Sequence, residues 1–217
     1  MTRLGLRLAA AALLAFGLVS CSPWTVRPID DGRSNSAAAA TSPSAYVDGM
    51  WSTKLLPAVL TTAVDARQLL EAMRQSPAAA RTQYARQQPG GAAYWIVKGQ
   101  GRVITVDSHS RVGLIQLAAT PPGARPDISI QCGPLLRGTS LRDATGLVNF
   151  SDFANQLQYA DVGNELNERV LKTVLAPLPI KALRGRRVSF AGAAPADEGE
   201  PAIHDLIPVR LEVEENR

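Results

Sequence analysis

Histidine and cysteine, the residues that most often hold metals or act as nucleophiles, are scarce in this sequence, with two of each among 217 residues. It also lacks the HExxH and CxxC patterns, a Walker phosphate-binding loop, a dinucleotide-binding glycine fingerprint and a GxSxG elbow. We place His109 in a hairpin turn and His204 in a loop, where isolated histidines form neither a metal site nor a catalytic triad. The sequence therefore predicts no metal, no cofactor and no familiar catalytic set.

Long apolar runs are also missing, with one exception at the start. Residues 8–18 (LAAAALLAFGL) would measure about 16 Å as a helix, against roughly 30 Å of bilayer hydrocarbon. Arg3 and Arg7 precede the run, and Leu18-Val19-Ser20-Cys21 follows it and matches a bacterial lipobox. We expect residues 1–20 to be a lipoprotein signal peptide and lipidated Cys21 to hold the protein on the bilayer of the bacterial envelope. The alternative is an ordinary cleaved signal peptide with a chance cysteine.

A large excess of charge of one sign is absent. The precursor has 23 Lys+Arg against 19 Asp+Glu, and loss of Arg3 and Arg7 with the signal peptide leaves 21 against 19. A chain this close to neutral has no electrostatic reason to bind nucleic acid, so we expect no nucleic-acid partner.

Composition divides the rest of the chain into a tether and one domain. Residues 21–44 are rich in Pro, Ser and Ala, which predicts a lipidated flexible tether. Residues 45–217 suffice for a single globular domain. Apolar residues at helical spacing predict a helical segment over 45–88, with breaks at Pro57 and Pro77.

From residue 93 onward, short β-branched runs alternate with turn residues, which is typical of strands. The predicted strands cover 95–106, 111–119, 127–132, 186–193 and 205–213. A long amphipathic helix over 151–176, capped by Ser151, falls between the third and fourth strands. This order is that of the OB fold, so we predict an α+β fold with an OB-like five-stranded β-barrel over 93–217. The rival interpretation is an open antiparallel sheet covered by one helix.

The loop at 133–150, before this helix, concentrates polar side chains among glycines. Its candidate site residues are Arg137, Thr139, Arg142, Asp143 and Asn149. Two guanidinium groups near a helix start could bind an anion or a polyhydroxylated ligand. The other interpretation is architectural: Asp143 pairs with an arginine, and Thr139 and Ser140 satisfy turn amides.

The helix itself carries amides on the side expected to face the core. At about 100° per residue, we place Phe153, Leu157 and Leu166 on one broad apolar face, with Gln156, Asn164 and Asn167 pointing the same way. Buried amides need hydrogen-bond partners. They would either hold the 133–150 loop through its backbone or line a polar pocket.

Cys132 ends the apolar run 128–132. Because lipid occupies Cys21, Cys132 has no partner for a disulfide. We interpret it as a small core residue and not as a nucleophile.

The stretch GPLLRGTSLRDATGLVNFSDFANQLQYADVGNELN (133–167) resembles the characteristic segment of the predicted periplasmic lipoproteins known as domain of unknown function 2291. Further matching pieces are VRPID (26–30), MWSTKLLP (50–57), YWIVKGQGRVITVD (94–107), GRRVSFAGA (185–193) and IPVRLEV (207–213). The resemblance implies an envelope lipoprotein whose genes often lie beside ABC-type sugar importers. It supplies no catalytic residues.

These observations favour a non-enzymatic accessory of solute uptake that contacts an ABC-type sugar transporter or its binding protein. The alternatives are direct binding of a sugar or anion by Arg137 and Arg142, and an undetected hydrolase that uses Asp143 or Asp152.

Overall fold

The computed structural model describes residues 42–88, 90–119, 125–197, 199 and 201–214. The predicted signal peptide, the lipidation site Cys21 and nearly all of the predicted tether lie outside the described residues. Within the described ranges, no helix has the length and apolarity required to cross a membrane.

The segment predicted as helical contains four α-helices, α2 (Pro43–Met50), α3 (Leu56–Thr62), α4 (Ala66–Gln75) and α5 (Pro77–Tyr84), with a π-helical turn at Trp51–Leu55. Two short strands, β1 (Val64–Asp65) and β2 (Arg86–Gln87), flank the last two helices. Helix α2 begins two residues before the predicted start at 45, because the Ser42 hydroxyl accepts a hydrogen bond from the Ala45 amide and caps it.

The sheet follows the predicted order of strands. Its main strands are β3 (Ala93–Asp107), β4 (Leu114–Ala118), β5 (Ile128–Gln131), β6 (Arg187–Pro195) and β7 (Ile203–Val213). The hydrogen-bonded neighbours run β3-β4-β5-β7-β6, and β6 pairs again with β3. The long β3 supplies both ends of this series, since Tyr94–Arg102 pair with β6 and Arg102–Asp107 pair with β4.

The helix between the third and fourth of these strands is shorter than predicted. Helix α7 spans Gln156–Val170 and continues as a π-helical turn over Leu171–Leu175, so its first residue is 156 and not 151. Asn155 caps it by accepting a hydrogen bond from the Gln158 amide at 2.9 Å, while Phe150–Asp152 form a separate 3-10 turn. The proposed cap Ser151 therefore lies outside the helix.

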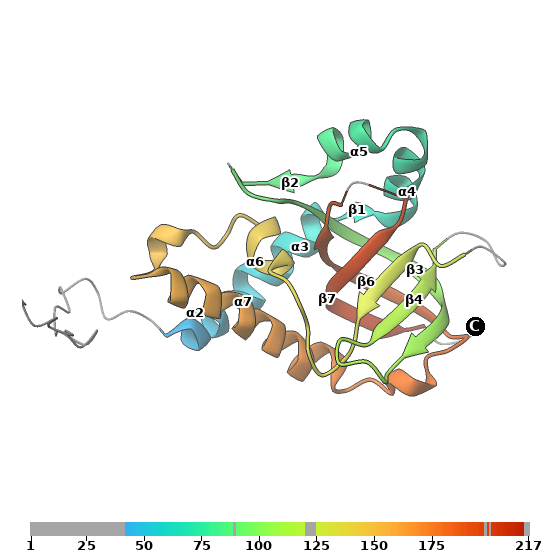
Figure 1. Ribbon diagram of the computed structural model, residues 1–217. Coiled ribbons are helices and arrows are strands. Elements are labelled where there is room, and N and C mark those ends of the chain that lie inside the picture. The colour runs from blue at the N-terminus through green and yellow to red at the C-terminus, as the bar shows by residue number, and fades with distance from the viewer. Residues whose placement is uncertain (1–41, 89, 120–124, 198, 200, 215–217) are drawn as a thin grey trace, which may run out of the picture. The chain divides into compact units, whose positions relative to one another are not determined.

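Helices cover the sheet on several sides (Figure 1). Helices α3 and α4 contact β3, and α7 packs on both α2 and β7. The core includes Val97, Ile115, Ile130, Phe190 and Leu206, each at most 1% exposed. A short helix that sequence reasoning missed, α6 (Ser140–Ala144), contacts β3 and β6 and lies within the 133–150 loop.

Candidate functional site

The 133–150 loop begins with a buried glutamine. Gln131, the last residue of β5, is 1% exposed. Its Nε2 donates to the carbonyl oxygens of Arg137 and Asp205 at 3.0 and 3.1 Å, and its Oε1 accepts from the Arg137 amide at 2.7 Å. Gln131 thus joins the start of the loop to β7. Sequence reasoning missed it, because one polar residue at the end of an apolar run carries no motif.

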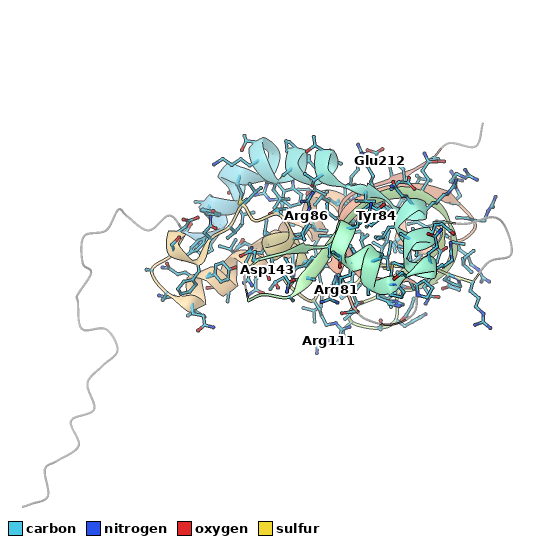
Figure 2. All side chains as sticks on the ribbon, turned by 90° about the horizontal axis from the view of Figure 1, so that it is seen from above. Arg81, Tyr84, Arg86, Arg111, Asp143 and Glu212 are labelled. Atoms are coloured by element: carbon cyan, nitrogen blue, oxygen red, sulfur yellow. The ribbon has the colours of Figure 1, made fainter. Side chains whose placement is uncertain are left out.

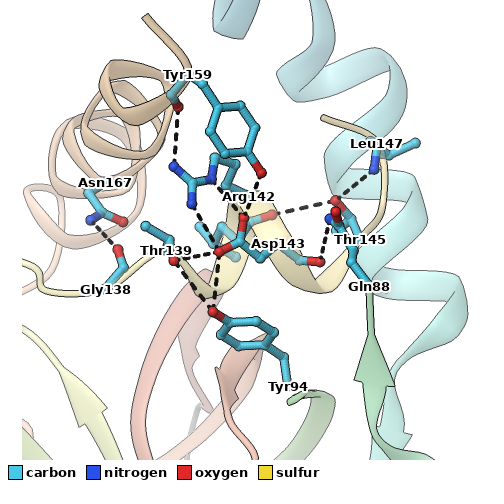
Figure 3. Close-up of polar contacts among 11 residues, drawn as sticks. Gln88, Tyr94, Gly138, Thr139, Arg142, Asp143, Thr145, Leu147, Tyr159 and Asn167 are labelled. Atoms are coloured by element: carbon cyan, nitrogen blue, oxygen red, sulfur yellow. Dashed lines mark hydrogen bonds and ion pairs between the residues drawn. The ribbon is translucent and has the colours of Figure 1, made fainter. Parts of the chain in front are cut away.

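Asp143 on α6 is the centre of a dense hydrogen-bond cluster (Figure 3). Its carboxylate accepts bonds from Thr139 Oγ1 at 2.6 Å, Arg142 Nε at 2.7 Å and Arg142 Nη2 at 3.1 Å. The hydroxyls of Tyr94 and Tyr159 each add a bond at 3.2 Å. Five donors use essentially all the lone pairs of a carboxylate. We call Tyr94, Thr139, Arg142, Asp143 and Tyr159 the Asp143 cluster.

Arg142 is held as firmly as its partner. Besides the two bonds to Asp143, its Nη1 donates to the Tyr159 carbonyl oxygen at 3.2 Å. Its guanidinium carbon lies 4.0 Å from the centroid of the Tyr159 ring, a cation–π arrangement. The side chains of Arg142 and Asp143 are only 12% and 16% exposed. This pair therefore links α6 to the first turns of α7.

The protonation state of Asp143 follows from these contacts. Burial by itself raises the pKa of the carboxyl, but the hydrogen bonds from Arg142, Thr139 and Tyr159 and the positive charge of Arg142 outweigh it. The pKa of Asp143 is therefore below its usual value. Burial and the neighbouring Asp143 charge raise the pKa of the Tyr159 phenol. At neutral pH the cluster holds one carboxylate, one guanidinium and protonated phenols.

The three amides of α7 do not share an environment. Asn167 is buried, and its Nδ2 donates to the carbonyl oxygens of Gly138 at 3.0 Å and Leu136 at 3.4 Å. It holds the loop through its backbone, which is one of the two roles expected of these amides. Gln156 and Asn164 are exposed, so the prediction that they face the core is wrong. Asn164 lies close to half a turn away from Leu166, and Gln156 lies in the first turn of α7, where nothing covers it.

The structure does not bring Arg137 and Arg142 together as one anion site. The Arg137 side chain is 62% exposed and approaches Asp205 at 3.9 Å, whereas Arg142 is committed to Asp143 and Tyr159. Asn149 is exposed and lies at the 3-10 turn, where its backbone amide donates to Asp152 Oδ2 at 3.4 Å. Each arginine therefore has its own carboxylate partner.

An aromatic cluster adjoins the Asp143 cluster where α2 meets α7. The Tyr46 and Phe153 rings lie 5.0 Å apart, Phe153 and Tyr159 5.9 Å, and Phe150 and Tyr159 5.6 Å. Phe150 is nonetheless 55% exposed, and Leu157 in the first turn of α7 is 71% exposed. The placement of Leu157 on the core face was wrong, because nine residues at about 100° each put it half a turn from Leu166.

Two open depressions flank the Tyr94 ring. One, of about 210 Å³, is lined in part by Gln88, Arg142 and Tyr159. The other, of about 360 Å³, is lined in part by Thr139 and Ser140. The polar side chains that line the first depression are Gln88 and four members of the Asp143 cluster, Tyr94, Arg142, Asp143 and Tyr159. Gln88 Nε2 donates to the Asp143 carbonyl oxygen at 3.1 Å, and the cluster members bond to one another.

Among the described residues, the remaining histidines and cysteine do not assemble into a site. His109 lies between β3 and β4, as predicted, but His204 lies in β7 and not in a loop. Cys132 is partly buried, and burial raises the pKa of its thiol to about 11, so the unreactive thiol form prevails at neutral pH. Across the described ranges, no group of three or more His, Cys, Asp or Glu side chains is placed to hold a metal.

Comparison with known proteins gives one family and one fold. A family model described as "Predicted periplasmic lipoprotein (DUF2291)" matches residues 10–212. The crystal structure of an OB-fold protein from Thermotoga maritima MSB8 is similar with a TM-score of 0.66 and 23% identity, over 79% of this chain and 98% of that chain. At this identity the likeness shows the fold alone, and it confirms the OB-like prediction at that level. A search of curated proteins gave no match.

Proposed function

The chain belongs to the family of predicted periplasmic lipoproteins DUF2291, as the resemblance of residues 133–167 indicated. We propose that it is a non-catalytic docking module anchored in the bacterial envelope. In this proposal the strand series closed by the β3–β6 pairing is a barrel that serves as a rigid platform. The docking surface lies at the junction of α2 and α7.

Support for a non-catalytic role comes from the two carboxylates considered for hydrolysis. A general acid or base needs a lone pair or a proton to exchange with substrate. Asp143 has neither to spare, because five donors surround an ionised carboxylate. Asp152 is exposed, and its Oδ2 accepts two bonds. The bond from the Asn149 amide closes a turn, and the bond from the Tyr46 hydroxyl joins this turn to α2.

The observation that carries the proposal is the exposure of Phe150 and Leu157. Large apolar side chains that remain in water on a rigid support are typical of interaction surfaces. Phe150 rests edge-on against Tyr159, and Tyr159 in turn is fixed by Asp143 and Arg142. The Asp143 cluster therefore supports Phe150 through Tyr159, while Leu157 is exposed in the first turn of α7. We name these two side chains the Phe150–Leu157 surface.

We further propose that the partner is a component of an ABC-type sugar importer or its binding protein. The suggestion comes from the genomic neighbourhood that the family resemblance implies. A protein held on the bilayer by Cys21 would meet an importer complex in the same membrane at a high effective concentration. A small exposed apolar surface suits a weak contact between two proteins that are held at a high effective concentration.

Site-specific photocrosslinking in cells tests this proposal. A photoreactive residue at position 150 or 157 should yield adducts with an importer component, whereas the same residue at Leu135, which is 45% exposed, serves as the matched control. The double variant Phe150→Ser and Leu157→Ser should lose copurification with the importer while keeping its melting temperature. Recovery of no importer component at either position, with normal sugar uptake in a deletion strain, would overturn the proposal.

The alternative of direct ligand binding has one observation in its favour, the depression of about 210 Å³ beside Tyr94 and Tyr159. Aromatic walls and an arginine suit a sugar. A saturable rise in melting temperature with a sugar, accompanied by shifts of the Gly90 and Gly91 amide signals in NMR spectra, would favour this alternative. The docking proposal expects neither.

A further inference from the structure

A further depression lies elsewhere on the protein, on the sheet and not on the 133–150 loop. It has a volume of about 300 Å³, and its lining includes Arg67, Lys98 and Arg210 together with Asp65 and Phe190. The three cations come from different elements, since Arg67 is in the first turn of α4, Lys98 is in β3 and Arg210 is in β7. Glu212, two residues along β7 from Arg210, lies well apart from Asp143 in Figure 2, so this depression is separate from the Asp143 cluster.

Strand pairing explains how these side chains meet. Asp65 of β1 is paired with Lys98 of β3, Lys98 with Ala191 of β6, and Ala191 with Arg210 of β7. Residues paired across neighbouring strands lie on the same face of a sheet, about 4.8 Å apart per strand. Lys98 and Arg210 therefore project from one face, on either side of the small Ala191.

The positive charge of this depression is not neutralised by the described part of the protein. Within those residues, no carboxylate lies within 4.0 Å of a charged nitrogen of Arg67, Lys98 or Arg210. The one acid in the lining, Asp65, directs Oδ1 to the backbone amides of Arg67 and Gln68 at 2.9 and 3.2 Å. Three cations face one carboxylate, and that carboxylate is occupied with capping α4.

The cations also keep most of their hydrogen-bond donors. Arg67 uses Nε on the Ala119 carbonyl oxygen at 2.7 Å, and Lys98 makes a long bond of 3.3 Å to the Leu60 carbonyl oxygen. Arg210 makes no side-chain hydrogen bond to any described residue. The bond from Arg67 fixes its guanidinium at the depression and leaves both Nη groups available.

We propose that this depression binds a phosphate group. A tetrahedral anion with several charged oxygens can accept bonds from three cations that approach from different sides, whereas one arginine fork already satisfies a carboxylate. The volume exceeds that of the ion itself, so the phosphate would belong to a small ester or to a lipid headgroup. Both sources share the same recognition chemistry, and the proposal does not depend on the Phe150–Leu157 surface.

The test uses the mature chain (residues 21–217) with Cys21→Ser, so that acylation does not dominate membrane binding. One arm titrates inorganic phosphate and glycerol phosphate against backbone amide NMR signals. The other arm measures cosedimentation with vesicles of phosphatidylglycerol, with phosphatidylcholine vesicles for comparison. Saturable shifts at residues 97–100 and 209–211 are expected in the first arm if the ligand is a free ester. Selective cosedimentation is expected in the second if the ligand is a headgroup.

Variants then assign the binding to this depression. Arg210→Gln and Lys98→Gln, both at exposed positions, should each weaken the observed binding about tenfold without lowering the melting temperature. Arg102→Ala is the matched control, since Arg102 is an exposed arginine on the same strand β3 and does not line the depression. Absence of binding in both arms, or equal weakening by Arg102→Ala, would overturn the proposal.

Discussion

Five hydrogen bonds end on the Asp143 carboxylate, and the nearest cation is its neighbour in sequence, Arg142. Sequence reasoning weighed such an ion pair against an anion site and preferred the architectural interpretation. It did not predict the hydrogen bonds to Asp143 from Tyr94 and Tyr159, because Tyr94 lies in β3 and Tyr159 in α7. Nothing local in the sequence connects either tyrosine with Asp143.

Replacing Asp143 by Asn keeps the size of the side chain but removes the charge that faces Arg142. We expect Asp143→Asn to lower the free energy of unfolding by about 2–3 kcal/mol at pH 7, because a largely buried guanidinium loses its counter-charge. Urea unfolding measures the loss. Lys172→Ala is the control, since it breaks only an exposed pair with Glu168 on α7, and its unfolding midpoint should match that of the wild type.

The stability difference between wild type and Asp143→Asn should depend on pH. The folded-state pKa of Asp143 is lowered, so its stabilising effect is complete above the unfolded value of about 3.9 and is lost as the pH falls through the folded value. The stability difference between wild type and Asp143→Asn should therefore stay constant from pH 7 to about 5 and shrink below about 4. A difference that persists unchanged in acid would show that the charge of Asp143 is not what stabilises the cluster.

Cys132 gives a second prediction at this scale. Burial raises the pKa of its thiol to about 11, and the negative charge of Asp107 adds to the effect. Since the thiolate is the reactive form, iodoacetamide at pH 7.5 (about 3.5 units below that pKa) should leave Cys132 largely unmodified in the folded protein. Peptide mass spectrometry measures the fraction of labelled Cys132 after reaction of the folded protein and of the protein unfolded in about 8 M urea. Rapid labelling of the folded protein would mean that the thiol is accessible and ionised.

At the scale of elements, the five main strands were predictable, whereas the short strands β1 and β2 and the details of α7 were not. Several main strands contain short runs of β-branched or aromatic residues, such as 95–97, 103–106 and 128–130, and turn residues separate them. The helix was predicted as one piece from Ser151, because Phe153 continues the apolar pattern to before its real start at Gln156. The five-residue α6 lies in a segment whose glycines and polar residues indicate a loop.

Asn167 and Asn164 form a matched pair for testing how α7 holds the loop. Asn167→Ala should lower the free energy of unfolding by about 1–3 kcal/mol, since it leaves the carbonyl oxygens of Gly138 and Leu136 without their donor. Asn164→Ala, at an exposed position three residues earlier on the same helix, should change it by less than about 0.5 kcal/mol. Guanidinium unfolding of the two variants compares them directly. Equal effects would mean that the loop does not depend on the Asn167 amide.

A substitution at Gly192 tests the packing of β6 against β7, at the point where the pairing register shifts between Ala191 and Gly192. A Cβ atom at this position would overlap the Ile207 carbonyl oxygen and press on Leu206 and Pro208. Gly192→Ala should therefore destabilise the protein by about 1–3 kcal/mol. Gly49→Ala is the control, because Gly49 lies in α2 with open space around it, and alanine there should stabilise the helix by about 0.5–1 kcal/mol. Thermal melts of both variants should shift in opposite directions.

At the scale of the whole molecule, α2 is joined to α7 and to the residues just before it by an ion pair and an aromatic contact. Arg169 of α7 forms an ion pair with Asp48 of α2, and the Tyr46 ring packs on Phe153. The lipobox cysteine precedes this junction by about twenty residues of sequence that is rich in Pro, Ser and Ala. The exposed Phe150–Leu157 surface therefore lies near α2, the first helix among the described residues.

Membrane attachment of the whole protein should depend on Cys21 alone. Lipidation at Cys21 would supply two or three acyl chains. Each acyl chain adds about 0.8 kcal/mol of membrane-binding free energy per buried CH₂, whereas a single acyl chain binds membranes only marginally. Cys21→Ala should abolish incorporation of labelled palmitate and leave the protein either as an uncleaved precursor or released from the membrane fraction. Cys132→Ala is the matched control, because it removes the other cysteine and should leave labelling and membrane retention intact. If the Cys21→Ala protein still carries label, the lipid is attached elsewhere, and the Leu18–Cys21 segment is an ordinary signal-peptide end with a chance cysteine.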